Sequence, residues 1–168
     1  MIIRRLLVPA VAATGVVLLA APSASAVPPD VTTFSDPLGG SFSCEGFDAT
    51  YSGHDRGRIT NLFDSQGVLV RQVGHIHAVE TDTNLATGET IVVRSNLAVH
   101  GELDAEGNLV TWSLTGELDI SNRPGDGIVL HDSGFVGLQA DGSDAMVTVL
   151  RGFHDTFTKD DAFCDALS

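Results

Sequence analysis

The sequence predicts an all-β fold in which an antiparallel meander closes into a small β-barrel, with a β-sandwich as the alternative. Three observations lead to this prediction. Short turns rich in Asp and Gly recur along the chain, the segments between them alternate apolar and polar residues, and helical periodicity is confined to the last residues. A chain of 168 residues is long enough for one domain with its own apolar core.

The first 26 residues have the pattern of a secretory signal peptide. Arg4 and Arg5 precede an apolar run over residues 6–21, and the small residues 24–26 match a cleavage site. Cleavage before Val27 would leave 142 of the 168 residues. The leader holds two of the nine basic residues and none of the 22 acidic ones, so the mature net charge would be −15 instead of −13. We therefore expect a secreted, extracellular protein of bacterial type.

The mature chain is divided by its turns. Residues 27–40 contain prolines and predict an extended N-terminal arm, and residues 41–168 predict a single β domain. Three similar turns, at residues 64–67, 104–107 and 141–144, each join an incoming strand to an outgoing one. Longer connections at residues 82–88 and 122–127 would link these hairpins into about six to eight strands. Residues 159–167 predict a short C-terminal helix.

Alternation within the strands predicts which side chains face the core. Over residues 108–120 one parity is apolar and the other polar, so we expect the apolar set to point inward. The predicted inward set is Val110, Trp112, Leu114, Leu118 and Ile120. The predicted outward set is Thr111, Ser113, Thr115, Glu117 and Asp119.

The two cysteines, Cys44 and Cys164, lie near opposite ends of the mature chain. An exported protein with a single pair of cysteines normally oxidises it, so the sequence predicts a disulfide between them. Closing so long a loop stabilises a fold by about 4 to 5 kcal/mol in the chain-entropy model.

The charge and hydropathy of the chain limit the kinds of partner that the protein can have. The only lysine is Lys159, and phosphate binding to nucleic acids needs clustered basic residues, so we expect no nucleic-acid partner. No segment after the leader is long and apolar enough for a membrane span. An acidic surface is typical of a protein kept in solution outside the cell. Nothing in the sequence specifies the oligomeric state.

Histidines and inward polar residues are the candidates for chemistry. His75 and His77, two residues apart on one strand, would share a face about 7 Å apart, which suits one metal ion if a third ligand joins them. Their alignment with the later hairpin instead predicts that both are exposed. Three His-Asp dipeptides begin at residues 54, 131 and 154. Adjacent strand residues point to opposite faces, so no dipeptide is itself a catalytic dyad, although members of different pairs can meet across strands.

Four polar residues fall on positions that the repeated hairpin turns inward. They are the predicted ligand-binding residues Gln72, Ser95, Asp132 and Arg151. Asp132 and Arg151 would be near-diagonal neighbours on adjacent strands, so they should pair with each other or with a ligand. No residue is predicted to be catalytic, and no cofactor is expected.

The chain also resembles known proteins. Residues 42–44, 64–67, 83–88, 124–127 and 163–167 together resemble a group of small secreted bacterial proteins of uncharacterised function. The architecture is similar in a looser way to the barrels of the allene-oxide-cyclase and dirigent kind, and that likeness concerns fold alone.

The sequence therefore predicts a secreted, non-catalytic β-barrel that binds a small molecule or a surface partner. One alternative is an extracellular metal-dependent or acid/base enzyme that uses His75 and His77. The other is a structural or interaction protein of the cell exterior.

Overall fold

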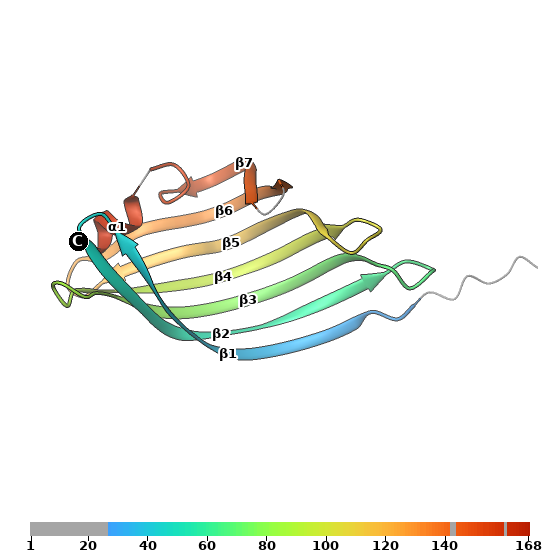
Figure 1. Cartoon of the computed structure of the whole chain (residues 1–168), viewed down its shortest axis with the longest axis horizontal. Coiled ribbons are helices and arrows are strands. Elements are labelled where there is room, and N and C mark those ends of the chain that lie inside the picture. Colours follow the sequence, from blue (N-terminus) through green and yellow to red (C-terminus); the bar gives the residue numbers. More distant parts are fainter. Residues whose placement is uncertain (1–26, 142–143, 160) are drawn as a thin grey trace, which may run out of the picture.

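The computed structural model describes residues 27–141, 144–159 and 161–168. It contains one antiparallel sheet of seven strands in sequence order and a short C-terminal helix (Figure 1). The strands are β1 (Asp30–Cys44), β2 (Phe47–Phe63), β3 (Leu69–Asn84), β4 (Thr90–Leu103), β5 (Leu109–Arg123), β6 (Gly127–Asp141) and β7 (Asp144–His154), followed by α1 (Ala162–Leu167). The predicted all-β meander with a short C-terminal helix is confirmed.

The Asp/Gly turns form as predicted, and their side chains explain why. Asp64 Oδ1 accepts hydrogen bonds from the backbone N–H groups of Gln66 and Val68, at 2.8 and 2.9 Å. Asp104 closes the turn between β4 and β5 in the same way. Gly67 stands at the last position of the first turn with φ of 84°, which only glycine adopts readily. In the third predicted turn, Gly142 and Ser143 lie outside the described residues.

The predicted N-terminal arm is extended because most of it is the first strand of the sheet. β1 pairs with β2 along its whole length, from Asp30 opposite Asn61 to Cys44 opposite Phe47. The sheet begins at residue 30, so residues 30–40 belong to it instead of preceding it.

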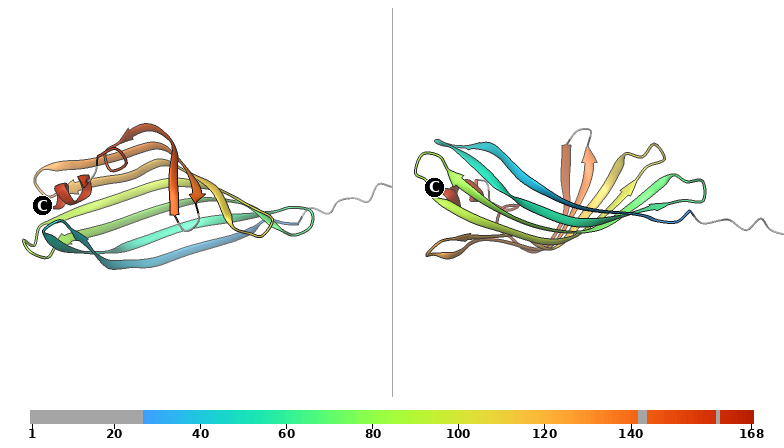
Figure 2. Two further views of the ribbon diagram at one scale, coloured as in Figure 1. Left: turned by 45° about the horizontal axis from the view of Figure 1, so that its top comes forward. Right: turned by 90° about the horizontal axis from the view of Figure 1, so that it is seen from below.

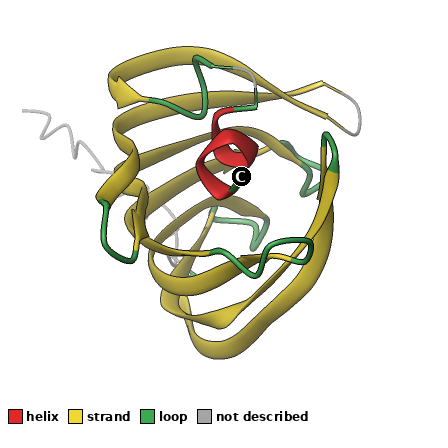
Figure 3. Ribbon diagram, turned by 90° about the vertical axis from the view of Figure 1, so that its left-hand side faces the viewer, coloured by secondary structure: helices red, strands yellow, loops and turns green. Residues whose placement is uncertain are grey.

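The sheet is open, and the predicted closure into a barrel is not confirmed. β1 and β7 are its two edges and do not pair with each other in the part of the chain that the structure describes. The strands instead twist and curl, so that one end of the sheet wraps around α1 (Figures 2 and 3). The face that contacts α1 is called the inner face below, and the opposite one the outer face.

The apolar core lies where α1 rests on the inner face. Leu167 of α1 is fully buried against Ala49, Ile91 and Val93. The disulfide between Cys44 and Cys164 joins the end of β1 to the helix with a Cα–Cα distance of 5.6 Å, as predicted. Beside it the rings of Phe42 and Phe163 pack edge to face, with centroids 5.7 Å apart. A helix of six residues is too short to be stable alone, so these contacts hold it in place.

Two β-bulges reverse the predicted alternation. In β5, Glu117 pairs with Ser133 and Asp119 with Asp132, so one extra residue stands between them. Before this bulge, the residues of β5 that were predicted to face inward do so. After the bulge, Asp119 lies on the inner face, so the prediction that Asp119 points outward is wrong. In β7 the pairing skips Thr148, with the same effect on the residues that follow.

Three glycines form a transverse line across β5, β6 and β7. Gly134 lies opposite both Gly116 and Gly152, and all three have positive φ, between 121° and 128°. A Cβ on Gly134 would lie 2.2 Å from the carbonyl oxygen of Arg151. The strands therefore approach each other here more closely than any side chain allows.

The predicted signal peptide, residues 1–26, lies outside the described residues. Among the residues that the structure does describe, no helix has the length and apolar character needed to span a bilayer.

Removing the disulfide should destabilise the protein strongly. The chain-entropy model assigns about 4 to 5 kcal/mol to a closed loop of this length, so Cys44→Ala with Cys164→Ala should lower the free energy of unfolding by most of that amount. Urea unfolding followed by circular dichroism measures the loss. A reducing agent should weaken the wild type and leave the double variant unchanged; a wild type that is equally stable when reduced would contradict the prediction.

Gly134→Ala should also destabilise the sheet. The left-handed backbone and the contact with the Arg151 carbonyl together predict a loss of about 2 kcal/mol or more in the free energy of unfolding. Gly39→Ala is the matched control, because its new Cβ would meet its nearest atom at an ordinary 3.6 Å. The same denaturation experiment should place the control within about 0.5 kcal/mol of the wild type. Equal losses in the free energy of unfolding for Gly134→Ala and Gly39→Ala would contradict this explanation of the three glycines.

Candidate functional site

Four acidic side chains form a line across the inner face beside α1, called here the carboxylate row. They are Glu80 and Asp82 on β3, Asp119 on β5 and Asp132 on β6. The strand register places them on one face: Glu80 lies opposite the core residue Val93, and Asp119 lies directly opposite Asp132. Asp82 and Asp132 are almost completely buried, at 1% and 0% exposure. Such burial of carboxylates without cations is costly and therefore points to a function.

Burial and mutual repulsion shift the protonation of this row. Burial, with the nearby charges of Glu80 and Asp119, raises the pKa of Asp82 to about 7. Burial first, and Asp119 second, raise the pKa of Glu80. Burial and the charge of Asp132 raise the pKa of Asp119, against a 2.6 Å hydrogen bond from the Ser121 hydroxyl that stabilises the ionised form. All three groups hold their protons more tightly than free carboxyls do.

One end of the row opens into a pocket of about 420 Å³ between β1, β2, β3 and α1. It is lined by Phe42, Tyr51, Glu80, Asp82 and Phe163. Tyr51 lies directly opposite Asp82 in the sheet, and its ring covers Gly40, where a Cβ would approach to 2.7 Å. Asp82 Oδ2 is buried and has no hydrogen-bond partner among the described residues. The pocket thus combines aromatic walls with a carboxylate oxygen free to accept a hydrogen bond. We call it the carboxylate pocket.

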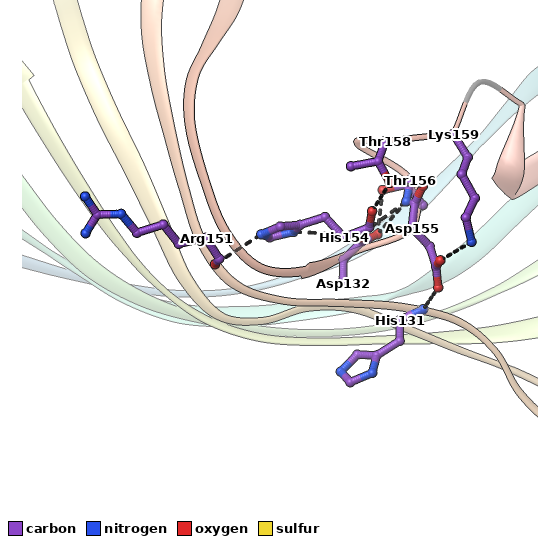
Figure 4. Close-up of polar contacts among 8 residues, drawn as sticks. All are labelled: His131, Asp132, Arg151, His154, Asp155, Thr156, Thr158 and Lys159. Carbon is purple, nitrogen blue, oxygen red and sulfur yellow. Dashed lines mark hydrogen bonds and ion pairs between the residues drawn. The ribbon is translucent and has the colours of Figure 1, made fainter.

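The other end of the row is closed by the segment after β7 (Figure 4). The Asp132 carboxylate accepts hydrogen bonds from both the backbone N–H and the hydroxyl of Thr156. His154 lies opposite Asp132, with Nδ1 3.9 Å from the nearer carboxylate oxygen. The two side chains are 2% and 0% exposed, so no solute reaches them in this conformation. Asp132 and His154 therefore act as a buried anchor for the chain segment that leads to α1.

Two of the three His-Asp dipeptides combine across strands β6 and β7. Asp132 of the first faces His154 of the second, and the Asp155 carboxylate accepts a hydrogen bond from the backbone N–H of His131 at 3.1 Å (Figure 4). Asp155 also forms an ion pair with Lys159, and this pair lowers the pKa of Asp155. The two pairs together hold the segment after β7 against β6.

The four predicted ligand-binding residues do not come together. Gln72 faces inward but lies eight residues before Glu80 on β3, roughly 26 Å along the strand, where its amide donates to Asn61 Oδ1 at 2.9 Å. The Ser95 hydroxyl donates a hydrogen bond to the carbonyl oxygen of Leu118 at 2.7 Å, so it supplies a partner for a backbone carbonyl at the β5 bulge. Only Asp132 belongs to the carboxylate row.

The predicted proximity of Asp132 and Arg151 is wrong. Arg151 lies opposite Phe135 and is exposed on the outer face, because the bulge at Thr148 reverses the parity of β7. Figure 4 shows its guanidinium pointing away from Asp132. The groups that contact the Asp132 carboxylate are instead the amide and hydroxyl of Thr156 and the imidazole of His154.

His75 and His77 lie together on the outer face, opposite Arg58 and Arg56 respectively. The described residues contain no group of three His, Cys, Asp or Glu side chains placed to hold a metal ion. Two guanidinium groups beside the imidazoles would also repel a cation. The alternative metal site therefore gains no support from the geometry.

Sequence reasoning missed six residues of the carboxylate pocket and row, namely Phe42, Tyr51, Glu80, Asp82, Asp119 and Phe163. The inward position of Asp119 could not be predicted because the bulge reverses the alternation of β5. The inward positions of Glu80 and Asp82 could not be predicted because the alternation around His75 and His77 does not show which side chains face inward. Phe42 and Phe163 become neighbours only through the disulfide, which was itself predictable. The alternation of Glu80 and Asp82 on one parity of a strand is the one local signal that pointed here.

No family model, curated protein or solved structure matches this chain. The resemblance to small secreted bacterial proteins and to allene-oxide-cyclase or dirigent-type barrels stays a prediction.

The raised pKa of Asp82 predicts that the folded state becomes less stable as the pH rises. A carboxyl that binds its proton more tightly when folded loses that advantage as the pH passes through about 7, so stability should fall by about 1 to 3 kcal/mol between about pH 5 and about pH 8. Urea unfolding across this range measures the slope. Asp82→Asn should flatten it, and Glu106→Gln, at an exposed turn, should keep it. Identical slopes in the wild type and Asp82→Asn would refute the assignment.

Proposed function

We propose that this protein is a non-catalytic binding protein that takes up a small organic cation, a protonated amine with an apolar body, in the carboxylate pocket. The observation that carries the proposal is the state of Asp82. Asp82 is only 1% exposed, its Oδ2 atom lacks a hydrogen-bond partner among the described residues, and it lines the carboxylate pocket. A buried acceptor of this kind favours a ligand that brings a donor.

The charges around the pocket support a cationic ligand. Glu80 and Asp82 stand next to each other on one face of β3, and neither takes part in an ion pair within the described part of the chain. Burial first, and the charges of neighbouring carboxylates second, raise the pKa of both groups, because both effects disfavour the ionised form. An ammonium group in the pocket would supply the missing charge and favour ionised carboxylates.

The aromatic walls support an ammonium with an apolar body. Phe42, Tyr51 and Phe163 line the same pocket as the two carboxyls. The electron-rich faces of aromatic rings attract cations, and desolvated contacts of this kind are worth about 2 kcal/mol. A volume of about 420 Å³ suits a small ligand and excludes a folded partner.

The compartment is part of the proposal. The disulfide is compatible with an extracellular location, where such bonds persist. We therefore assign this binding to the outside of the cell.

Phenethylamine should bind the wild-type protein, and its neutral analogue phenylethanol should not. Isothermal titration calorimetry near neutral pH should also show proton release when the amine binds, because Asp82 with a pKa of about 7 is then partly protonated. Asp82→Asn should weaken binding by about tenfold or more and reduce the proton release. Tyr51→Leu, which keeps an apolar side chain and removes the aromatic face, should weaken binding with the proton release intact.

Two controls make this test specific. Glu106→Gln removes one acidic charge from an exposed turn and should bind the amine as the wild type does. Tetramethylammonium carries the charge without an N–H donor and should bind more weakly than the amine. Equal binding of phenethylamine and phenylethanol, or equal losses in Asp82→Asn and Glu106→Gln, would rule out the cation site.

A further inference from the structure

The outer face of β2 and β3 carries a compact group of basic side chains. Arg58 lies directly opposite His75, and Arg56 lies directly opposite His77. Directly opposite residues share a face with Cβ atoms about 5 Å apart, and residues two apart on a strand are about 7 Å apart. The four side chains therefore rise from the corners of one small rectangle, called here the outer basic patch.

The neighbouring strands add hydrogen-bonding groups and no acid. β1 places Thr33 opposite Arg58 and Ser35 opposite Arg56. On the other side, β4 places Ala98 opposite His75 and Asn96 opposite His77. The rows through the patch meet their first acidic side chain at Glu117, on β5. The patch is thus an island of positive charge on a chain whose net charge is −13.

The two guanidinium groups of the patch are free to bind an anion. Arg56 and Arg58 are exposed and make no ion pair with any described residue, whereas Arg71 is paired with Glu102 at 3.4 Å. A cavity of about 420 Å³ borders all four basic residues, together with Phe34 and Gly57. This volume holds a phosphate or sulfate group with part of the molecule that carries it.

We propose that the outer basic patch binds a tetrahedral oxyanion, the phosphate or sulfate group of a small extracellular ligand. Guanidinium groups bind such oxyanions through paired N–H donors, and the two imidazoles and the hydroxyls of Thr33 and Ser35 supply further donors. Charge attraction extends only about 8 Å at physiological ionic strength, and the acidic remainder of the protein repels a long polyanion. The patch therefore fits one anionic group and not a nucleic acid. The site lies on the face opposite the carboxylate pocket and does not depend on the function proposed for that pocket.

The test uses inorganic phosphate and inorganic sulfate, titrated separately into the intact protein at an ionic strength held constant with chloride. Ring signals of His75 and His77 in nuclear magnetic resonance spectra report binding at the patch, and calorimetry reports affinity. We expect saturable shifts of these two histidines. Stronger binding of phosphate assigns a phosphate ester as the natural ligand, and stronger binding of sulfate assigns a sulfate ester.

Variants test whether the anions bind at the outer basic patch and not elsewhere on the protein. Arg56→Gln with Arg58→Gln should weaken binding by about tenfold or more. Arg151→Gln is the matched control, because Arg151 is also exposed on the outer face and unpaired among the described residues; it should change affinity less than about twofold. Should the double arginine variant fail to fold, His75→Gln with His77→Gln is the second variant, and it should weaken binding several-fold. Shifts that do not saturate with either ion, or an equal loss in Arg151→Gln, overturn the proposal.

Discussion

The covalent bond between Cys44 and Cys164 is the constraint on which the inner face depends. An open sheet with one apolar face needs a cover, and a helix of six residues has too few contacts to supply one unaided. The disulfide joins that helix to the end of β1, 120 residues away in sequence, and so keeps Leu167 on the core and Phe163 beside Phe42. The carboxylate pocket exists because the helix is held at that edge of the sheet.

The carboxylate row lowers the stability of the folded protein. Each buried acidic group that lacks a cation destabilises the fold through desolvation and repulsion, and proton uptake relieves part of that strain. Asp132 is stabilised differently, by the amide and hydroxyl of Thr156, and it ties the segment after β7 to the sheet. The row therefore has a structural end at Asp132 and an unsatisfied end at Asp82, and the unsatisfied end is the one that opens into a pocket.

Local sequence patterns predicted the parts of the fold that local interactions determine. The turns at Asp64 and Asp104 form because an Asp side chain accepts the backbone N–H groups that follow it, so composition alone identifies them. Closure into a barrel requires the first and last strands to pair, and no local pattern reports that. The bulges after Glu117 and at Thr148 each add one residue to a strand, so every later side chain of that strand points to the opposite face from the predicted one. Asp119 and Arg151 were assigned to the wrong faces for this reason, so most of the candidate site could not be predicted.

Strand β3 contributes to both charged surfaces, and the period of a β-strand keeps them apart. On β3 the acidic residues Glu80 and Asp82 share one parity, and His75 and His77 share the other. Opposite charges three residues apart on a helix would lie side by side and neutralise each other, whereas on this strand the sheet lies between them. The acidic groups consequently lie in low-dielectric surroundings beside α1, where their charge is costly. The guanidinium groups of Arg56 and Arg58 are exposed to water, where they keep their charge at little cost.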